Sequence, residues 1–309
     1  MTVLTIIAAI VLLILVIMAA VVIFVVRYLA YHPKSKRKPL HHEAMAHCSL
    51  KLTEFVRTNN DNQKIYAWFT KNVDSSIGDH VLLLQHGHRQ NRHEMLKQAE
   101  ILYKAGFSIL ITTIRAHDQS DGKFITFGLK EAEDIRCWHT FLTAEQRFLP
   151  KKIGFIGNSM GGVTLLRTHY LYKIGAVLVL QSVLADLDET IKKRASYVTR
   201  LPGLLFQIPI STLIKIWTRF NTRDVKPHLW ATAITIPAFI MQGGSDTLVP
   251  TTSGETLYNA LKTDAKFKKL WFEVKQKHVC FEHDHTQAFH DNLTTFLYKH
   301  FVNAKSTQS

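Results

Sequence analysis

Short apolar runs alternate with segments of helical spacing along most of this chain, and this alternation limits its possible folds more than any other feature. Each run has five to seven residues, which is typical of a strand that is buried on both faces. The segments between the runs are long enough to form crossover helices. The runs are HVLLLQ (80–85), FSILIT (107–112), KKIGFIG (151–157), AVLVLQ (176–181), AFIMQG (238–243) and LWFEV (270–274).

Two earlier runs differ from these because polar and apolar residues alternate within them. They cover residues 50–57 and 64–70 and are separated by a polar Asn/Asp turn, so we expect a hairpin. Together with the six apolar runs, they predict a mostly parallel sheet of eight strands with helices on both faces. This arrangement belongs to the α/β class.

The alternation is interrupted between residues 182 and 235, where no strand pattern is found. This insert contains the apolar stretch LPGLLFQIPISTLIKIW (201–217). An insertion near the strand ends of such a sheet is the usual place for a cap, which we expect at about residues 183–235. Two alternatives are an ordinary long connection with its own small core, and a surface that rests on a membrane.

The N-terminus is almost wholly aliphatic and uncharged from Val3 to Val26. At 1.5 Å per residue this stretch can cross a hydrocarbon core of about 30 Å. A cleaved signal peptide would have a basic start and a shorter apolar run, whereas only Met1 and Thr2 come first here. We therefore predict a retained transmembrane anchor over residues 1–27.

Basic residues follow the apolar stretch, and no Asp or Glu occurs before Glu43. The positive-inside rule then predicts a single-pass protein whose larger, C-terminal part is cytoplasmic. We expect a basic tether at 28–47 that can lie on anionic headgroups, a folded domain at 48–302 and a tail at 303–309. The basic residues are Arg27, Lys34, Lys36, Arg37 and Lys38.

The overall charge of +14, with an isoelectric point near 9.6, raises the question of an acidic partner. Basic residues are spread along the chain without a recognised nucleic-acid-binding module, so we expect no nucleic-acid partner and attribute the charge to a membrane-facing tether and cap. The three cysteines lack metal-ligand spacing, and their odd number argues against a disulfide framework.

Ser159 lies in the sequence GFIGNSMGG, at the point where an apolar strand changes into a helical segment. Residues 157–161 match the pattern G-x-S-x-G, which in this context indicates a nucleophile elbow. Such a turn exposes the serine hydroxyl at the N-terminus of a helix, where backbone N–H groups favour a developing negative charge. The alternative is a structural serine in a tight turn.

A serine nucleophile requires a base and an acid that orients it, and after a nucleophile elbow these follow in the order Asp, His. Asp246 follows the run at 238–243 and is our predicted acid. His278 follows the run at 270–274 and is the preferred base, with His283 and His285 as alternatives. The His-Asp-His sequence at 283–285 could also bind a metal, but a second ligand cluster is missing from the sequence, and we predict no metal.

An oxyanion hole requires two N–H donors. We predict the backbone N–H of Met160, directly after the serine, and that of His88, in the loop HGHRQNRH (86–93) that follows a predicted strand.

Four stretches give this chain a resemblance to the α/β-hydrolase superfamily. They are LLLQHGHRQNR, GFIGNSMGG, MQGGSDTLVPTTSGETLYNAL, and LWFEV with the histidine that follows it. More narrowly, the chain resembles membrane-anchored bacterial members of the serine aminopeptidase-like and acyl-esterase branch, over about residues 50–302.

The resemblance implies an α/β-hydrolase fold with a helical cap between its sixth and seventh strands. It also implies a base well before the last helix, which strengthens the choice of His278. The chain departs from the family pattern at Asn158, where many relatives have His, and at Asp118, where a glycine is usual.

These features lead us to expect a membrane-tethered serine hydrolase that cleaves carboxylic ester or thioester bonds through an acyl-enzyme, without a cofactor. A small-molecule or lipid-like ester suits the apolar insert. A peptidase or amidase remains an alternative, because loops and cap form the substrate pocket. A second alternative is a non-catalytic membrane scaffold, since the fold does not by itself establish activity.

Overall fold

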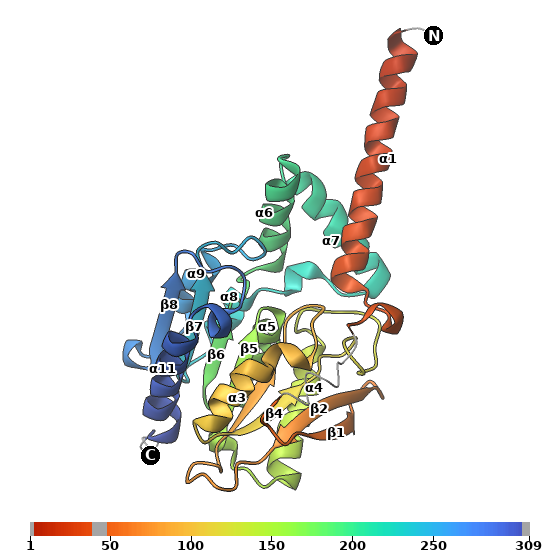
Figure 1. The fold of residues 1–309 in the computed structure, drawn as a ribbon. Coiled ribbons are helices and arrows are strands. Elements are labelled where there is room, and N and C mark those ends of the chain that lie inside the picture. The colour runs from red at the N-terminus through yellow and green to blue at the C-terminus, as the bar shows by residue number, and fades with distance from the viewer. Residues whose placement is uncertain (1–2, 39–47, 305–309) are drawn as a thin grey trace.

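An eight-stranded sheet forms the centre of the computed structural model, which describes residues 3–38 and 48–304 (Figure 1). The strand order is β1-β2-β4-β3-β5-β6-β7-β8. The pairs β1–β2 and β2–β4 are antiparallel, and all other pairs are parallel. The α/β class and the strand number predicted from the sequence are thus confirmed. The strands are β1 Thr53–Thr58, β2 Lys64–Thr70, β3 Val81–Gln85, β4 Ser108–Thr112, β5 Ile153–Asn158, β6 Leu178–Gln181, β7 Ala238–Gly243 and β8 Lys268–Glu273.

Helices cover both faces of the sheet. Successive residues of each central strand point to opposite sides, and both sets of side chains are buried, so each face needs a helix layer. In β3, Leu83 belongs to one core cluster, whereas Leu82 and Leu84 belong to the other. Helices α4, α5, α8 and α9 pack on the first face, and α3, α10 and α11 pack on the second. Their bounds are α3 Leu96–Lys104, α4 Glu131–Thr140, α5 Met160–Tyr172, α8 Pro227–Ala231, α9 Ser253–Ala260, α10 Phe281–Asp284 and α11 Thr286–Leu297.

The insert between β6 and β7 begins with two helices, α6 (Leu187–Thr199) and α7 (Leu204–Thr218). These helices project from the sheet on the side of helix α1 (Val3–Ala30), and the N-terminal part of α1 extends beyond the rest of the molecule (Figure 1). The C-terminal part of α1 packs against α7. Val22, Val26 and Ala30 are buried in this contact and in the core below it.

Of the predicted tether (28–47), the structure describes residues 28–38: residues 28–30 end helix α1, and residues 31–38 are docked on the domain instead of forming a free tether. His32 is buried and its backbone N–H donates to the carbonyl of Lys123 at 2.8 Å. The Arg37 guanidinium donates to the carbonyls of Ser120 and Gly122. These carbonyls thus bind a basic side chain that the sequence analysis placed in a tether lying on anionic headgroups. The rest of the tether (39–47) and residues 305–309 of the tail lie outside the described residues.

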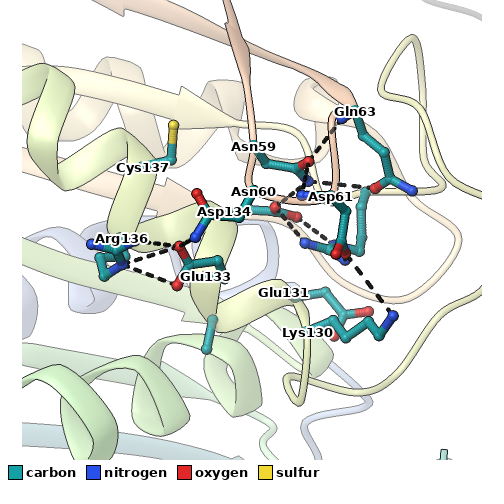
Figure 2. A network of polar contacts seen from close by, with 12 residues as sticks. Asn59, Asn60, Asp61, Gln63, Lys130, Glu131, Glu133, Asp134, Arg136 and Cys137 are labelled. Carbon is teal, nitrogen blue, oxygen red and sulfur yellow. Dashed lines mark hydrogen bonds and ion pairs between the residues drawn. The ribbon is translucent and has the colours of Figure 1, made fainter.

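A polar network fastens the turn between β1 and β2 to helix α4 (Figure 2). The Arg115 guanidinium is buried and donates to both carboxylate oxygens of Asp134, with both distances at 2.7 Å. Asn59 in the turn donates to the same carboxylate at 2.7 Å. Two strands that lie at the edge of the sheet are thereby attached to the helix layer.

We expect Arg115→Ala to lower the free energy of unfolding by about 3 kcal/mol or more, because it leaves the buried Asp134 carboxylate without its cation. Arg136→Ala is the matched control, since its ion pair with Glu133 is partly exposed to solvent and contributes less than about 1 kcal/mol. Urea unfolding of the full-length protein in detergent measures both. Equal effects of the two substitutions would contradict a structural role for the buried pair.

Candidate active site

Ser159 lies at the turn from β5 into α5 with a left-handed backbone conformation (φ 51°) that is rare outside glycine. The turn depends on glycines because neighbouring backbone comes very close. A Cβ on Gly157 would lie 2.5 Å from the Gly162 nitrogen, and a Cβ on Gly161 would lie 2.3 Å from the carbonyl oxygen of Gln85. The local sequence therefore holds Ser159 in a strained conformation of the kind that clusters at functional sites.

Ser159, His278 and Asp246 form one chain of hydrogen bonds. His278 Nε2 lies 3.0 Å from Ser159 Oγ, and His278 Nδ1 lies 2.7 Å from Asp246 Oδ2. The three residues come from the loops after β5, β8 and β7, which end at the same edge of the sheet. An imidazole in this position can accept the serine proton, and the carboxylate holds it in the required orientation.

Asp246 is anchored on its other side by backbone groups. Its Oδ1 accepts hydrogen bonds from the N–H groups of Leu248 at 2.8 Å and Val249 at 2.9 Å. The Asp246 side chain has no exposed surface, whereas that of His278 is 18% exposed. The carboxylate is therefore held in one orientation and shielded from solvent, whereas the imidazole remains accessible from the substrate side.

The His278 loop is positioned by a close approach to β7. A Cβ on Gly243 would lie 2.3 Å from the Gln276 carbonyl oxygen, so only glycine permits this contact. The Gln276 side chain donates to the Val279 carbonyl at 2.7 Å, and the Val279 N–H donates to Ser182 Oγ at 3.0 Å. These contacts set the position of the imidazole from both sides.

The two alternative bases lie elsewhere. The His283 side chain is 52% exposed, and its Nε2 lies 3.9 Å from Glu282. The His285 ring packs near Trp271 and Phe281. Within residues 3–38 and 48–304, the structure brings only His278 to both Ser159 and Asp246, and no group of three or more potential metal-ligating side chains is found.

The loop that carries His88 lies beside Ser159, since a Cβ on Gly87 would be 3.4 Å from the Ser159 Cβ. Among the described residues, neither the His88 N–H nor the Met160 N–H donates a hydrogen bond. Two such donors near a nucleophile can bind an oxyanion. The His88 ring points the other way, toward the Leu29 carbonyl at 3.0 Å, and burial lowers its pKa to about 3, so the imidazole is neutral.

Glu94 is a component of this site that the sequence analysis did not find. Its Oε2 accepts a hydrogen bond from the Gly87 N–H at 3.0 Å, and its Oε1 accepts one from Asn158 Nδ2 at 3.3 Å. Burial raises the pKa of the Glu94 carboxyl to about 7. Glu94 thus connects the loop before His88 to the residue before Ser159. No local pattern marks it, because one Glu in a polar loop is usually solvated.

Glu94→Ala is expected to lower kcat about tenfold to a hundredfold with a much smaller change in KM, because the Gly87 N–H loses its acceptor and the loop beside Ser159 is no longer held. Glu94→Gln is the matched control, since its amide oxygen can still accept from Gly87. Steady-state kinetics of both variants with one ester substrate tests this. Similar losses in both variants would contradict a role through the Gly87 hydrogen bond.

Comparisons with known proteins agree with this geometry. A sequence model of the prolyl oligopeptidase family matches residues 95–304. The uncharacterized protein YqkD of Bacillus subtilis is 28% identical over 181 residues, which cover 58% of this chain. The matched region spans 59% of YqkD, about three fifths of its length.

Solved structures extend the comparison to the whole sheet. The esterase Pf2001 of Pyrococcus furiosus has a TM-score of 0.70 and 25% identity, with 88% of this chain and 98% of the esterase covered. An acylaminoacyl peptidase of Pyrococcus horikoshii has a TM-score of 0.64 and 15% identity, with 87% of this chain and 45% of the peptidase covered. The second likeness concerns the fold alone. Together they confirm the α/β-hydrolase fold that the sequence motifs suggest.

Proposed function

Because this chain belongs to the prolyl oligopeptidase family and is a serine hydrolase of the α/β-hydrolase fold, we propose that it is a membrane-tethered enzyme that cleaves carboxylic ester or thioester bonds. The observation that carries the proposal is the hydrogen-bonded chain from Ser159 through His278 to Asp246.

In the proposed reaction, Ser159 Oγ attacks the carbonyl carbon of the substrate while His278 Nε2 takes the serine proton. The N–H groups of His88 and Met160 bind the resulting oxyanion. The tetrahedral intermediate expels the alcohol or thiol, which receives the proton from His278 and leaves an acyl group on Ser159. Water then attacks the carbonyl carbon of the acyl group while His278 Nε2 takes a proton from it. The second tetrahedral intermediate expels Ser159 Oγ, which receives the proton from His278, and the acid is released. No step requires a cofactor or a metal.

The chain lengths of the two solved relatives favour an ester substrate over a peptide. The Pyrococcus furiosus esterase is covered over almost its whole length, whereas the peptidase extends well beyond the matched region. The apolar cap helix α7 also suits an apolar acyl group. The second candidate, cleavage of a peptide or amide bond, is favoured by the name of the family and by the acylaminoacyl peptidase.

The membrane tether is supported by α1, which has 28 residues and is the one described helix that is long and apolar enough to cross a bilayer. A signal sequence has a similar composition. Val26 and Ala30 are fully or almost fully buried, however, and Leu29 accepts the hydrogen bond from His88. Cleavage within this helix would remove part of the core, which favours a retained anchor. The basic residues after it favour a cytoplasmic catalytic domain.

The proposal is tested by a matched substrate panel with the full-length protein in detergent. We expect kcat/KM for p-nitrophenyl acyl esters to exceed that for the corresponding acyl-alanine p-nitroanilides by at least about a hundredfold, or about 2.7 kcal/mol. The reverse preference would establish the peptidase alternative. If the folded protein turns over neither class and takes up no fluorophosphonate, it is a non-catalytic scaffold.

A further inference from the structure

The tip of the cap, residues 197–208, comprises the end of α6, the turn after it and the start of α7, and exposes a group of large apolar side chains. Each is between 48% and 63% exposed. Contiguous exposed apolar surface is rare on soluble monomers and marks contact with a partner or a membrane. The residues are Tyr197, Val198, Leu201, Leu204, Leu205 and Ile208.

The position of the tip relative to α1 identifies the partner. The turn between α6 and α7 lies on the same side of the molecule as the free N-terminal part of α1 (Figure 1). Helix α7 contacts α1 directly, so the apolar surface of the anchor continues into that of the cap. If α1 crosses a bilayer, the tip faces the surface of that bilayer.

The charge of the cap fits an anionic lipid surface. From Thr190 to Arg223 the chain carries basic residues but no Asp or Glu. Basic residues beside an apolar face are typical of segments that lie in a membrane interface, where they bind anionic headgroups. The acidic residues of α6 are confined to its first turn, at the end away from the tip. Arg200 is the basic residue in the tip itself, and Lys192, Lys193 and Arg194 lie one to two turns before it on α6, whereas Lys215, Arg219 and Arg223 lie toward the far end of α7.

A groove between α1 and α7 has a volume of about 460 Å³ and is suited to a lipid acyl chain. Its lining is aliphatic apart from the hydroxyl of Thr212 and the sulfur of Met18. An apolar groove beside a membrane-spanning helix is filled most favourably by hydrocarbon. The lining residues are Met18, Ala19, Val22, Ile23, Ile208, Pro209, Thr212 and Leu213.

We propose that the tip of the cap is embedded in the anionic leaflet next to α1, with lipid acyl chains in the α1–α7 groove. This inference rests on the proposed membrane tether but not on ester specificity. The protein then has two contacts with the bilayer, a spanning helix and an interfacial cap. The tip of the cap thereby lies among the acyl chains of the lipids, and, combined with the proposed ester specificity, this makes a membrane lipid ester the expected substrate class.

The direct test uses a tryptophan placed at the tip. Full-length protein with Leu205→Trp is reconstituted into vesicles of phosphatidylcholine and phosphatidylglycerol, in which the phosphatidylcholine is either plain or brominated on its acyl chains. The matched control is Val73→Trp. Val73 is also exposed, but it precedes β3 and so lies at the opposite edge of the sheet from the cap. The fluorescence of the unsubstituted protein is subtracted from that of each variant, which gives the signal of the added tryptophan.

We expect brominated lipid to quench more than about half of the fluorescence added by Leu205→Trp and almost none of that added by Val73→Trp, because bromine quenches only on contact within the bilayer. An unquenched Leu205→Trp in protein that floats with the vesicles overturns the proposal. If that protein is also dimeric, the tip contacts a second copy instead. Failure of the protein to float with the vesicles shows that α1 is no anchor and overturns the membrane tether on which this proposal rests. Ester turnover by the same samples tests the proposed hydrolase activity separately.

Discussion

Ser159→Ala is expected to lower kcat for ester hydrolysis by at least about 10⁴-fold. Removal of the nucleophile abolishes the acyl-enzyme route, and only binding and oxyanion stabilisation remain. The substitution removes one oxygen from the surface of the site, so the protein should fold as before. Initial rates with a p-nitrophenyl ester, together with the unfolding temperature, measure both effects.

The matched control for this experiment is Ser245→Ala. Ser245 stands next to Asp246, but its hydroxyl is exposed and donates to the Val274 carbonyl at 3.2 Å, away from the His278 imidazole. Its loss should change kcat less than about threefold. A Ser159→Ala protein with wild-type turnover would mean that another residue or a bound water is the nucleophile, and the proposed reaction would have to be abandoned.

The second large effect is expected for His278→Ala, with a loss in kcat of a similar size, about 10⁴-fold or more. Without the imidazole, no base lies within hydrogen-bond distance of Ser159 Oγ among the described residues. His283→Ala is the control, because it removes an exposed imidazole that contacts neither Ser159 nor Asp246. It should leave kcat nearly unchanged.

Added imidazole separates a catalytic loss from a structural one in the His278→Ala variant. A small base that enters the vacated space should restore part of the activity, with a rate that rises with its concentration. It should have no effect on Ser159→Ala. Inactivity of His283→Ala together with full activity of His278→Ala would assign the base to His283 and contradict the geometry.

The nucleophile could be predicted from the sequence because its constraints are local. Gly157 and Gly161 are required by backbone contacts within the elbow and with β3, and the strand before them is recognisable from its apolar residues. Asp246 could be predicted for a related reason, since it follows a recognisable strand in the expected order. The structure brings these two residues together with His278.

The base could not be chosen with the same certainty, because four histidines occur between residues 278 and 290. What distinguishes His278 is a set of long-range contacts. Because Gly243 has no Cβ, the Gln276 carbonyl can approach its backbone closely, and Ser182 Oγ accepts a hydrogen bond from the backbone N–H of Val279. Such contacts leave no periodic pattern in the sequence.

Two features were missed for similar reasons. Glu94 functions through the Gly87 N–H and Asn158, and neither partner is its sequence neighbour. The segment after α1 has the composition of a solvated tether, yet Arg37 binds carbonyl groups near residue 120. Composition cannot reveal that pairing. Because α1 contributes to the core and residues 31–38 bind the domain through hydrogen bonds, removal of residues 1–38 is expected to destabilise the domain, and the tests above therefore use the full chain.

The most direct test of the proposed enzyme is labelling of the intact, detergent-solubilised protein with a fluorophosphonate. The reagent is attacked by an activated serine, loses fluoride and remains attached through a phosphorus–oxygen bond, so digestion and mass spectrometry locate the modified residue. We predict one adduct, on the peptide that contains Ser159, and its disappearance in both Ser159→Ala and His278→Ala. A folded protein with no adduct, or with an adduct on another serine, would contradict the account.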